Sequence, residues 1–263
     1  MVFTAPQESV LPAERRRRIV EYLKANRSGK NEELAAALGV SLATVRRDLD
    51  LLATQGMVNR THGGAVLPEH STAYERLDSE KRLLFQEEKR RIGAAAAKMV
   101  GDGETLILDS GSTTFEVARH LADHKNLTII TNDLLIASTL EFDPTTELMV
   151  TGGVRRSGFS VLIGPVTEDL LRGVRVNRSF LSADAVDLTH GITNATFPEA
   201  ATKRLVIEAA QEVILVVDHS KFGGTALAKV AGLERVHRIV TDAGIGDEVL
   251  QGLERLGIPV SVV

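Results

Sequence analysis

The chain has 263 residues, of which 43% are hydrophobic and 25% are charged, as in an ordinary globular protein of one large or two average domains. It contains no cysteine, which excludes disulfides, thiolate metal sites and cysteine catalysis. No apolar run approaches the roughly 20 residues that span a bilayer, and the N-terminal residues lack the pattern of a signal peptide. We therefore expect a cytoplasmic protein without membrane contact.

Positive charge is concentrated in the N-terminal part of the chain. Residues 1–67 hold ten Lys and Arg against seven Asp and Glu, a balance of +3, whereas the remainder holds 21 against 28, a balance of −7. This difference favours contact between the N-terminal part and a polyanion such as a nucleic acid. It is small, so it only supports the motifs described next.

The first predicted helix is Ala13–Arg27, with an inward stripe formed by Ile19, Tyr22 and Leu23. The basic run Arg15–Arg18 near its start opposes the helix dipole. Contact with phosphates would explain the run, and so would a simply solvated helix face.

A second helix is predicted at Asn31–Leu38, followed by Gly39, which can adopt the left-handed conformation that ends a helix. The third predicted helix lies within Val40–Leu52, with Ser41 as its N-cap. Its apolar stripe consists of Val45, Leu49 and Leu52. Helix, tight turn and helix form the helix-turn-helix layout, whose second helix can lie in the major groove.

Arg46 and Arg47 lie mostly off the apolar stripe of this third helix. In an ordinary solvated helix, the two arginines would be tied to Asp48 and Asp50. In a DNA-reading helix they would meet the nucleic acid. Adjacent helical residues point about 100° apart, so the two arginines cannot read the same base. We expect one in the groove and the other on a phosphate.

Residues 57–66, M-V-N-R-T-H-G-G-A-V, alternate around a Gly-Gly pair and predict a short two-stranded wing. Arg60 and His62 at its tip are suited to phosphate or minor-groove contact. A lone histidine is more often structural, but the neighbouring arginine and glycines favour contact with DNA.

The run E-E-L-A-A-A-L-G-V-S-L-A-T-V-R-R-D-L-D-L-L, followed by G-M-V-N-R-T-H-G-G-A-V, resembles the N-terminal domain of DeoR-family bacterial transcription regulators. The resemblance implies that the third helix and the wing bind DNA. The DNA contacts predicted on this basis are Ser41, Thr44, Arg46, Arg47, Arg60 and His62.

Residues 69–88 are polar and charged and predict a linker that runs into a helix, continued by an amphipathic helix at Glu87–Met99. We expect a DNA-binding winged helix-turn-helix domain over residues 13–68, a linker and helix over 69–88, and a sensing domain over 89–263.

Short apolar runs alternate with helical patterns after residue 100. The expected strands are Thr105–Leu108, Leu127–Thr131, Glu147–Val150, Ser179–Ala183, Val213–Val217, Arg238–Thr241 and Pro259–Val262. The expected helices are Thr114–Leu121, Leu134–Leu140, Glu168–Arg172, Glu199–Ala210 and Asp247–Leu256. This alternation predicts an α/β fold with a mostly parallel sheet.

Ligands of such folds bind at the carboxyl ends of the strands. The first expected strand is followed by D-S-G-S-T-T, a hydroxyl-rich turn that opens a helix and suits an anion. It matches neither the Walker loop nor the dinucleotide fingerprint, and an ordinary N-capped turn is the alternative.

Other strands also end in polar or glycine residues, and Lys203 and Lys221 follow in the same blocks. Either lysine alone would more often form a surface salt bridge. Together, cations for phosphate and carboxylates for hydroxyls suit a phosphorylated sugar or polyol. The predicted effector contacts are Asp109, Ser110, Gly111, Ser112, Thr113, Thr131, Asn132, Gly152, Gly153, Asp184, Glu199, Lys203, Asp218 and Lys221.

The blocks L-D-S-G-S-T-T, T-N-D-L, T-G-G, E-A-A-T-K and D-H-S-K-F-G resemble the DeoR-family sensor domain, so the resemblance spans about residues 13–242. That domain is similar to ribose-5-phosphate isomerase, which implies a sugar-phosphate pocket and raises an enzyme as the rival hypothesis. The isomerase pattern D-G-A-D-E-[VI]-D matches Asp184 and Asp187, but Leu181 and Ala185 replace its other two carboxylates. We therefore predict a binding pocket with no catalytic residues, cofactor or metal.

The resulting expectation is a regulator, and more specifically a repressor, of a sugar or sugar-phosphate catabolic operon. Its partners would be double-stranded operator DNA and a phosphorylated sugar or polyol, whether a pentose, hexose, amino-sugar or glycerol phosphate. The small DNA-binding domain predicts a homodimer or homotetramer on repeated half-sites. A DNA-binding architectural protein with an inert body is a third hypothesis, but it leaves the polar strand ends unexplained.

Overall fold

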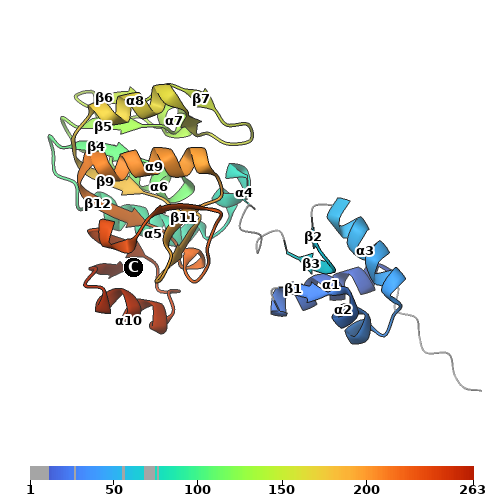
Figure 1. Cartoon of the computed structure of the whole chain (residues 1–263). Helices are drawn as coiled ribbons and strands as arrows, with labels where there is room; N and C mark the ends of the chain where they lie inside the picture. The colour runs from blue at the N-terminus through green and yellow to red at the C-terminus, as the bar shows by residue number, and fades with distance from the viewer. Residues whose placement is uncertain (1–11, 27, 55–56, 68–74, 76) are drawn as a thin grey trace, which may run out of the picture. The chain divides into compact units, whose positions relative to one another are not determined.

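The computed structural model describes residues 12–26, 28–54, 57–67, 75 and 77–263. The chain divides into two compact units, residues 1–74 and 75–263 (Figure 1). The second unit therefore begins at Glu75, within the stretch that was predicted as linker and helix. The domain boundaries expected at residues 68 and 88 remain predictions.

The first unit packs three helices, α1 (Pro12–Asn26), α2 (Asn31–Leu38) and α3 (Leu42–Thr54), around one apolar core. The predicted stripe of α3 is buried, as are Ile19 and Leu23 of α1. Gly39 has a φ of 67° and ends α2 in the left-handed conformation, as predicted. The Ser41 hydroxyl accepts a hydrogen bond from the Thr44 N–H at 3.2 Å, which confirms it as the N-cap of α3.

The wing has three antiparallel strands instead of the two predicted. The strands β1 (Ser28–Lys30), β2 (Asn59–Thr61) and β3 (Gly64–Val66) pair in the order β1-β3-β2. β1 is only Ser-Gly-Lys, too short to show alternation in the sequence. It lies so close to β3 that a Cβ at Gly64 would overlap the Gly29 carbonyl, so glycine is needed there.

A seven-stranded parallel sheet forms the centre of the second unit. Every strand of this sheet overlaps a predicted one, although β9 and β12 each begin three residues earlier than predicted, and the parallel sheet confirms the α/β class. The order is β15 (Val260–Val262), β14 (Arg238–Thr241), β12 (Ala210–Val216), β9 (Val176–Leu181), β4 (Thr105–Leu108), β5 (Thr128–Thr131) and β6 (Glu147–Val150).

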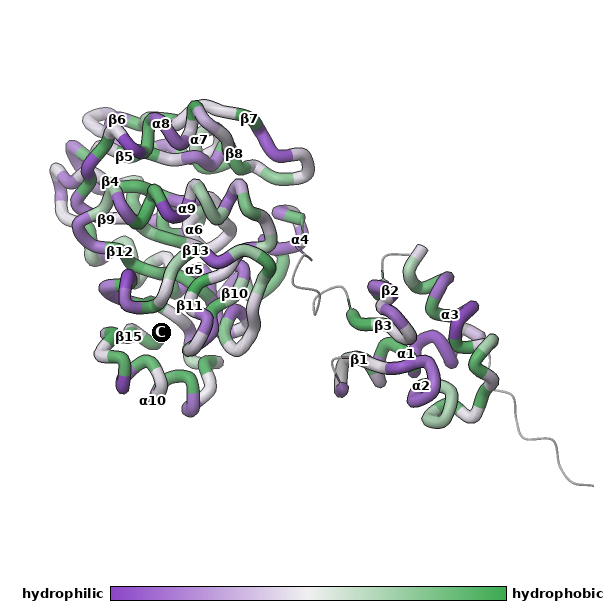
Figure 2. The backbone as a smooth tube through the Cα atoms, viewed as in Figure 1, coloured by the Kyte–Doolittle hydropathy of each residue, from purple (hydrophilic) through white to green (hydrophobic). Residues whose placement is uncertain are grey.

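Alternate residues of the strands point to opposite faces of the sheet and enter two separate cores. Leu106 and Leu108 of β4 pack with α5 (Gln86–Ala97) and α6 (Ser112–Arg119), whereas Ile107 belongs to the core of the other face, with α8 (Pro165–Gly173) and α9 (Phe197–Ala209). The second unit is therefore a three-layer α/β/α structure. Figure 2 shows the matching amphipathic colouring along α10 (Asp247–Arg255), whose Leu253 is fully buried.

The helix α4 (Asp78–Leu83) lies within the stretch predicted as linker and helix. Several other short elements were not predicted. They are the hairpin β7 (Val154–Arg155) and β8 (Leu162–Ile163), and an antiparallel sheet of β10 (Ala185–Asp187), β11 (Gly191–Asn194) and β13 (Ala228–Ala231). α7 (Leu134–Thr139) follows β5, and a 3₁₀ turn, η2 (His219–Lys221), follows β12. Among the described residues, every helix falls short of the length and hydropathy that a membrane crossing demands.

Candidate functional sites

The arginines of α3 are presented to solvent. Arg46 and Arg47 are exposed, and within the described part of the chain neither forms an ion pair. The neighbouring acids have other partners: Asp48 is buried and pairs with Arg15 at 2.5 Å, and Asp50 pairs with Arg60 at 3.1 Å. The alternative in which Asp48 and Asp50 hold the α3 arginines is therefore wrong. An exposed cationic helix face is suited to nucleic-acid phosphates and base edges.

The two wing residues differ in their surroundings. Besides its pair with Asp50, Arg60 donates to the Gly64 carbonyl at 3.3 Å, so this guanidinium also fixes the wing to its own unit. His62 is exposed in the turn between β2 and β3. DNA contact by either residue stays a prediction, as it does for Ser41 and Thr44 on α3.

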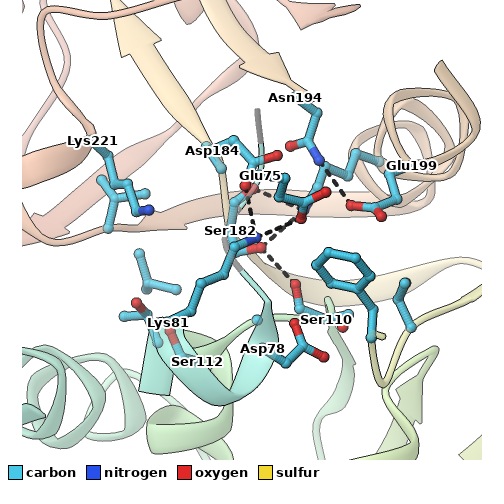
Figure 3. Close-up of a pocket in the computed structure, with 18 residues that line it drawn as sticks. Glu75, Asp78, Lys81, Ser110, Ser112, Ser182, Asp184, Asn194, Glu199 and Lys221 are labelled. Atoms are coloured by element: carbon cyan, nitrogen blue, oxygen red, sulfur yellow. Dashed lines mark hydrogen bonds and ion pairs between the residues drawn. The ribbon is translucent and has the colours of Figure 1, made fainter. Parts of the chain in front are cut away.

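A pocket lies at the carboxyl ends of β4 and β9 (Figure 3). The loop after β4 and the first turn of α6 form one side, and Ser182 to Asp184 after β9 form the next. Asn194 ends β11, and η2 contributes Lys221. The predicted effector contacts that line the pocket are Ser110, Gly111, Ser112, Thr113, Asp184, Glu199, Lys203 and Lys221.

The other predicted contacts do not line the pocket. Asp109 is 1% exposed and accepts from the Ser182 N–H and hydroxyl, at 3.0 and 2.9 Å. Thr131 donates to the Leu108 carbonyl, and Asn132 to the Leu162 carbonyl. The Gly152 carbonyl accepts a hydrogen bond from the Thr167 hydroxyl, which also lies against Gly153. Asp218 caps η2. These residues thus stabilise the backbone at the ends of the strands.

The loop Ser110–Thr113 is fixed by hydrogen bonds to Asp133. Asp133 accepts hydrogen bonds from the Ser110 hydroxyl at 2.8 Å and from the Gly111 N–H at 3.3 Å. Burial raises the pKa of Asp133, and its hydrogen bonds from the Ser110 hydroxyl and the Leu135 and Ile136 N–H groups oppose the rise. A Cβ at Gly111 would lie 2.8 Å from Ser182 Oγ, so only glycine fits. No side chain caps α6, which leaves its first N–H groups and the positive end of its dipole for an anion.

Lys203 is the most deeply buried cation of the pocket, at 4% exposed. Its ammonium pairs with Asp109 and donates to the Ser182 carbonyl at 3.0 Å and to the Ser182 hydroxyl at 2.9 Å. A buried charge is tolerated only when paired and hydrogen-bonded in this way. The network ties α9 to the ends of β4 and β9 and fixes one wall of the pocket.

Three carboxylates, those of Glu75, Asp184 and Glu199, have oxygens within 4.8 Å of one another. Two cations lie between them. Lys81 contacts Glu75 at 2.5 Å and Asp184 at 2.9 Å, and Arg156 pairs with both Glu75 and Glu199. The acids are thus already neutralised by side chains, as Figure 3 shows for Glu75 and Asp184. This pairing favours a rearranging polar site over a metal centre.

The pKa values in this cluster follow from burial and pairing. Burial disfavours the charge on Lys81, but Asp184 and Glu75 outweigh it and raise the pKa above its usual value. For Asp184, burial is likewise outweighed, here by Lys81, and the pKa is lowered. Burial raises the pKa of Glu199, and the Glu75 carboxylate adds to the rise. The negative charge of the cluster is therefore favoured on Asp184 and disfavoured on Glu199.

The sequence prediction missed several lining residues, namely Glu75, Asp78, Lys81, Phe159, Val161, Ser182 and Asn194. Phe159 packs under the Arg156 guanidinium, with 3.9 Å between the guanidinium carbon and the ring centroid. Ser182 could have been found, because it precedes the predicted Asp184 at the end of β9. Glu75 and Lys81 lie in the charged stretch predicted as a linker that runs into a helix, whose pattern does not indicate a ligand site.

Two protein-family models match this chain. The DeoR C terminal sensor domain matches residues 84–243, and the DeoR-like helix-turn-helix domain matches residues 15–71. The chain belongs to the DeoR family. It resembles the members of that family over nearly its whole length, and the relatives below are named as regulators of transcription.

The glycerol-3-phosphate regulon repressor of Escherichia coli is 36% identical over 89% of this chain and 92% of that protein. The transcriptional regulator GlpR of Haloferax volcanii is 35% identical, covering 95% of this chain and 98% of that protein. The transcriptional repressor AccR of Agrobacterium fabrum is 35% identical over 93% and 92%. Transcriptional regulation is thus the shared role of these relatives.

Likeness to solved structures is weaker. Ribose 5-phosphate isomerase from Plasmodium falciparum aligns with a TM-score of 0.38 and 17% identity, over 52% of each chain. This similarity is too low to carry an argument. The two aspartates that match the isomerase pattern have different surroundings. Asp184 lines the pocket, whereas Asp187 does not and instead accepts hydrogen bonds from the His190 N–H and Nδ1.

Proposed function

We propose that this protein is a repressor of a sugar or sugar-phosphate catabolic operon, and that a phosphorylated sugar or polyol controls its binding to operator DNA. The observation that carries the proposal is the pocket beside the uncapped N-terminus of α6, in the same chain as an exposed arginine pair on α3. The printed name of one relative, a glycerol-3-phosphate regulon repressor, supports an effector that contains phosphate.

On the DNA side, α3 enters the major groove with Ser41, Thr44, Arg46 and Arg47, while Arg60 and His62 of the wing approach the backbone or minor groove. One such unit has a small footprint, so the protein acts as a homodimer or homotetramer on repeated half-sites. Operator DNA as the partner places this activity in the cytoplasm.

On the effector side, the N–H groups and hydroxyls of Ser110–Thr113 hold the phosphate, and Lys221 adds positive charge. Asp184, Glu199 and Asn194 accept hydrogen bonds from the hydroxyls. Support comes from the Asn194 side-chain oxygen, which is buried and has no hydrogen-bond partner within the described residues. A ligand hydroxyl would satisfy it.

We infer binding without catalysis. Asp184 is tied to Lys81 and to the Ala195 N–H, so no free carboxylate base stands at this position. Asp187 lies outside the pocket lining, and Leu181 and Ala185 replace the remaining carboxylates of the isomerase pattern. Purified protein incubated with ribose 5-phosphate should form no ketose, and efficient turnover would refute the inference.

A thermal-shift screen against glycerol, pentose, hexose and amino-sugar phosphates tests the proposal. At about 100 times its Kd, an effector stabilises by about 2.7 kcal/mol, or roughly 5–10 °C in Tm. Ser112→Asp places a negative charge at the α6 N-terminus, where it suits the helix but repels phosphate, so the shift should vanish. The control Ser79→Asp, on the exposed first turn of α4, should keep it. Absence of any shift in the wild type would refute the phosphorylated effector.

A further inference from the structure

Glu75 is an unexpected occupant of the effector pocket. It is the first residue of the second unit, so in the chain it directly follows the DNA-binding unit. Its side chain is only 4% exposed and reaches into the centre of the pocket beside Asp184 and Ser182 (Figure 3). Among the described residues, Lys81 and Arg156 alone hold its carboxylate.

The pocket has no excess of positive charge while Glu75 is inside. The lining carboxylates are those of Glu75, Asp78, Asp184 and Glu199. The cations are Lys81, Lys203, Lys221 and the adjacent Arg156, and Lys203 is already paired with the buried Asp109. A doubly charged phosphate would make this site strongly negative, in surroundings where charge is poorly screened. Withdrawal of Glu75 removes one negative charge and frees one side of both Lys81 and Arg156.

The pocket is also too full for a sugar phosphate. The space left inside it is about 40 Å³. That space holds water molecules, but a phosphorylated sugar does not fit wholly inside it beside the present side chains. A ligand of that class must therefore displace a side chain.

Glu75 is the member of the cluster whose departure disturbs least. Without it, Arg156 is still held by Glu199 and the Phe159 ring, and Lys81 still contacts Asp184 at 2.9 Å. Asp78 is fixed differently, because its carboxylate accepts from the Ser160 backbone N–H at 2.5 Å. The two cations would thus stay in place to meet an incoming anion.

We propose that Glu75 is an internal competitor of the effector, whose acidic group enters when the Glu75 carboxylate leaves Lys81 and Arg156. The inference rests on the proposed function and adds its regulatory step: effector binding releases Glu75, the residue with which the second unit begins. Ligand binding in the pocket is thereby linked to the attachment of the DNA-binding unit, without any contact between ligand and DNA.

The test uses the full chain and inorganic phosphate as the probe. Glu75→Gln keeps the size of the side chain but removes its charge, and it should bind phosphate about tenfold more tightly than the wild type in calorimetry. The matched control is Glu87→Gln on α5, an exposed glutamate that pairs only with Arg90 in the described structure and should bind as the wild type does.

Hydrogen–deuterium exchange supplies the second readout. Phosphate should slow exchange in the loop 110–115 of the wild type but accelerate it about threefold in the segment 75–83, because Glu75 is expelled. In Glu75→Gln this segment should exchange rapidly before phosphate is added.

Equal phosphate affinity in the wild type and Glu75→Gln, or protection of segment 75–83 by phosphate, would overturn the competition and leave the proposed function intact. Failure of phosphate to bind any of the three proteins would overturn both.

Discussion

The two units hold their charged side chains in opposite ways. On α3, Arg46 and Arg47 are exposed and have no ionic partner among the described residues, whereas in the pocket Lys203 and Lys81 are enclosed with carboxylates. A polyanion such as DNA is met by cations that are already presented to solvent. A small anion must instead compete with carboxylates inside the protein, so its binding necessarily rearranges the pocket. We propose that this difference lets the second unit respond to an effector while the first unit binds DNA.

The largest effect is expected at the buried pair. Lys203→Met leaves Asp109 buried without its counter-charge and should lower the free energy of unfolding by about 3–5 kcal/mol. Since the chain has no tryptophan, urea unfolding followed by circular dichroism is the suitable measurement. The exposed Lys125→Met is the control and should change stability by less than about 0.5 kcal/mol. A similar small change for Lys203→Met would mean that the pocket pairs are not structural.

On the exposed side of the comparison, Arg46→Ala should weaken operator binding by about 1–3 kcal/mol and leave stability unchanged. The operator fragment would come from in vitro selection, and affinity would be followed by fluorescence anisotropy at several salt concentrations. Arg90→Ala removes another exposed arginine, on α5, and should bind like the wild type. Unchanged affinity and salt dependence for Arg46→Ala would show that α3 is not the reading helix.

Lys89 of α5 extends the comparison, because it is buried and its ion pair with Asp218 is long, at 3.9 Å, although its ammonium donates to the Lys81 and Leu84 carbonyls. Burial lowers its pKa from 10.5 to about 8, although Asp218 opposes the shift. Between these values the unfolded chain binds more protons than the folded one, so the free energy of unfolding should rise with pH. The rise is at most about 1.4 kcal/mol per pH unit. Lys89→Met should lack it, and parallel pH profiles of variant and wild type would contradict the assignment.

Regular patterns explain what the sequence predicts well. The strands of the parallel sheet are buried apolar runs, and α3 has a cap, a stripe and a preceding glycine turn, all of which are local signals. β1 and the antiparallel sheet of β10, β11 and β13 are too short to show a period.

The site was only partly predictable for a similar reason. Strand ends locate Ser110–Thr113 and Asp184, because the topology of a parallel sheet brings these ends together. Lys81 pairs with Asp184 across 103 residues of sequence, and Arg156 with Glu75 across 81. No local sequence pattern around these residues indicates the pairs, because they form only in the packed tertiary structure.

Linkage between effector and operator is the central claim, and one titration measures it directly. The phosphorylated sugar that raises Tm most is added to the wild-type protein bound to a labelled operator fragment. We expect operator affinity to fall about 5–150-fold at saturation, and Ser112→Asp to bind the operator normally but not to respond. Wild-type affinity that stays constant at saturating ligand would contradict the account.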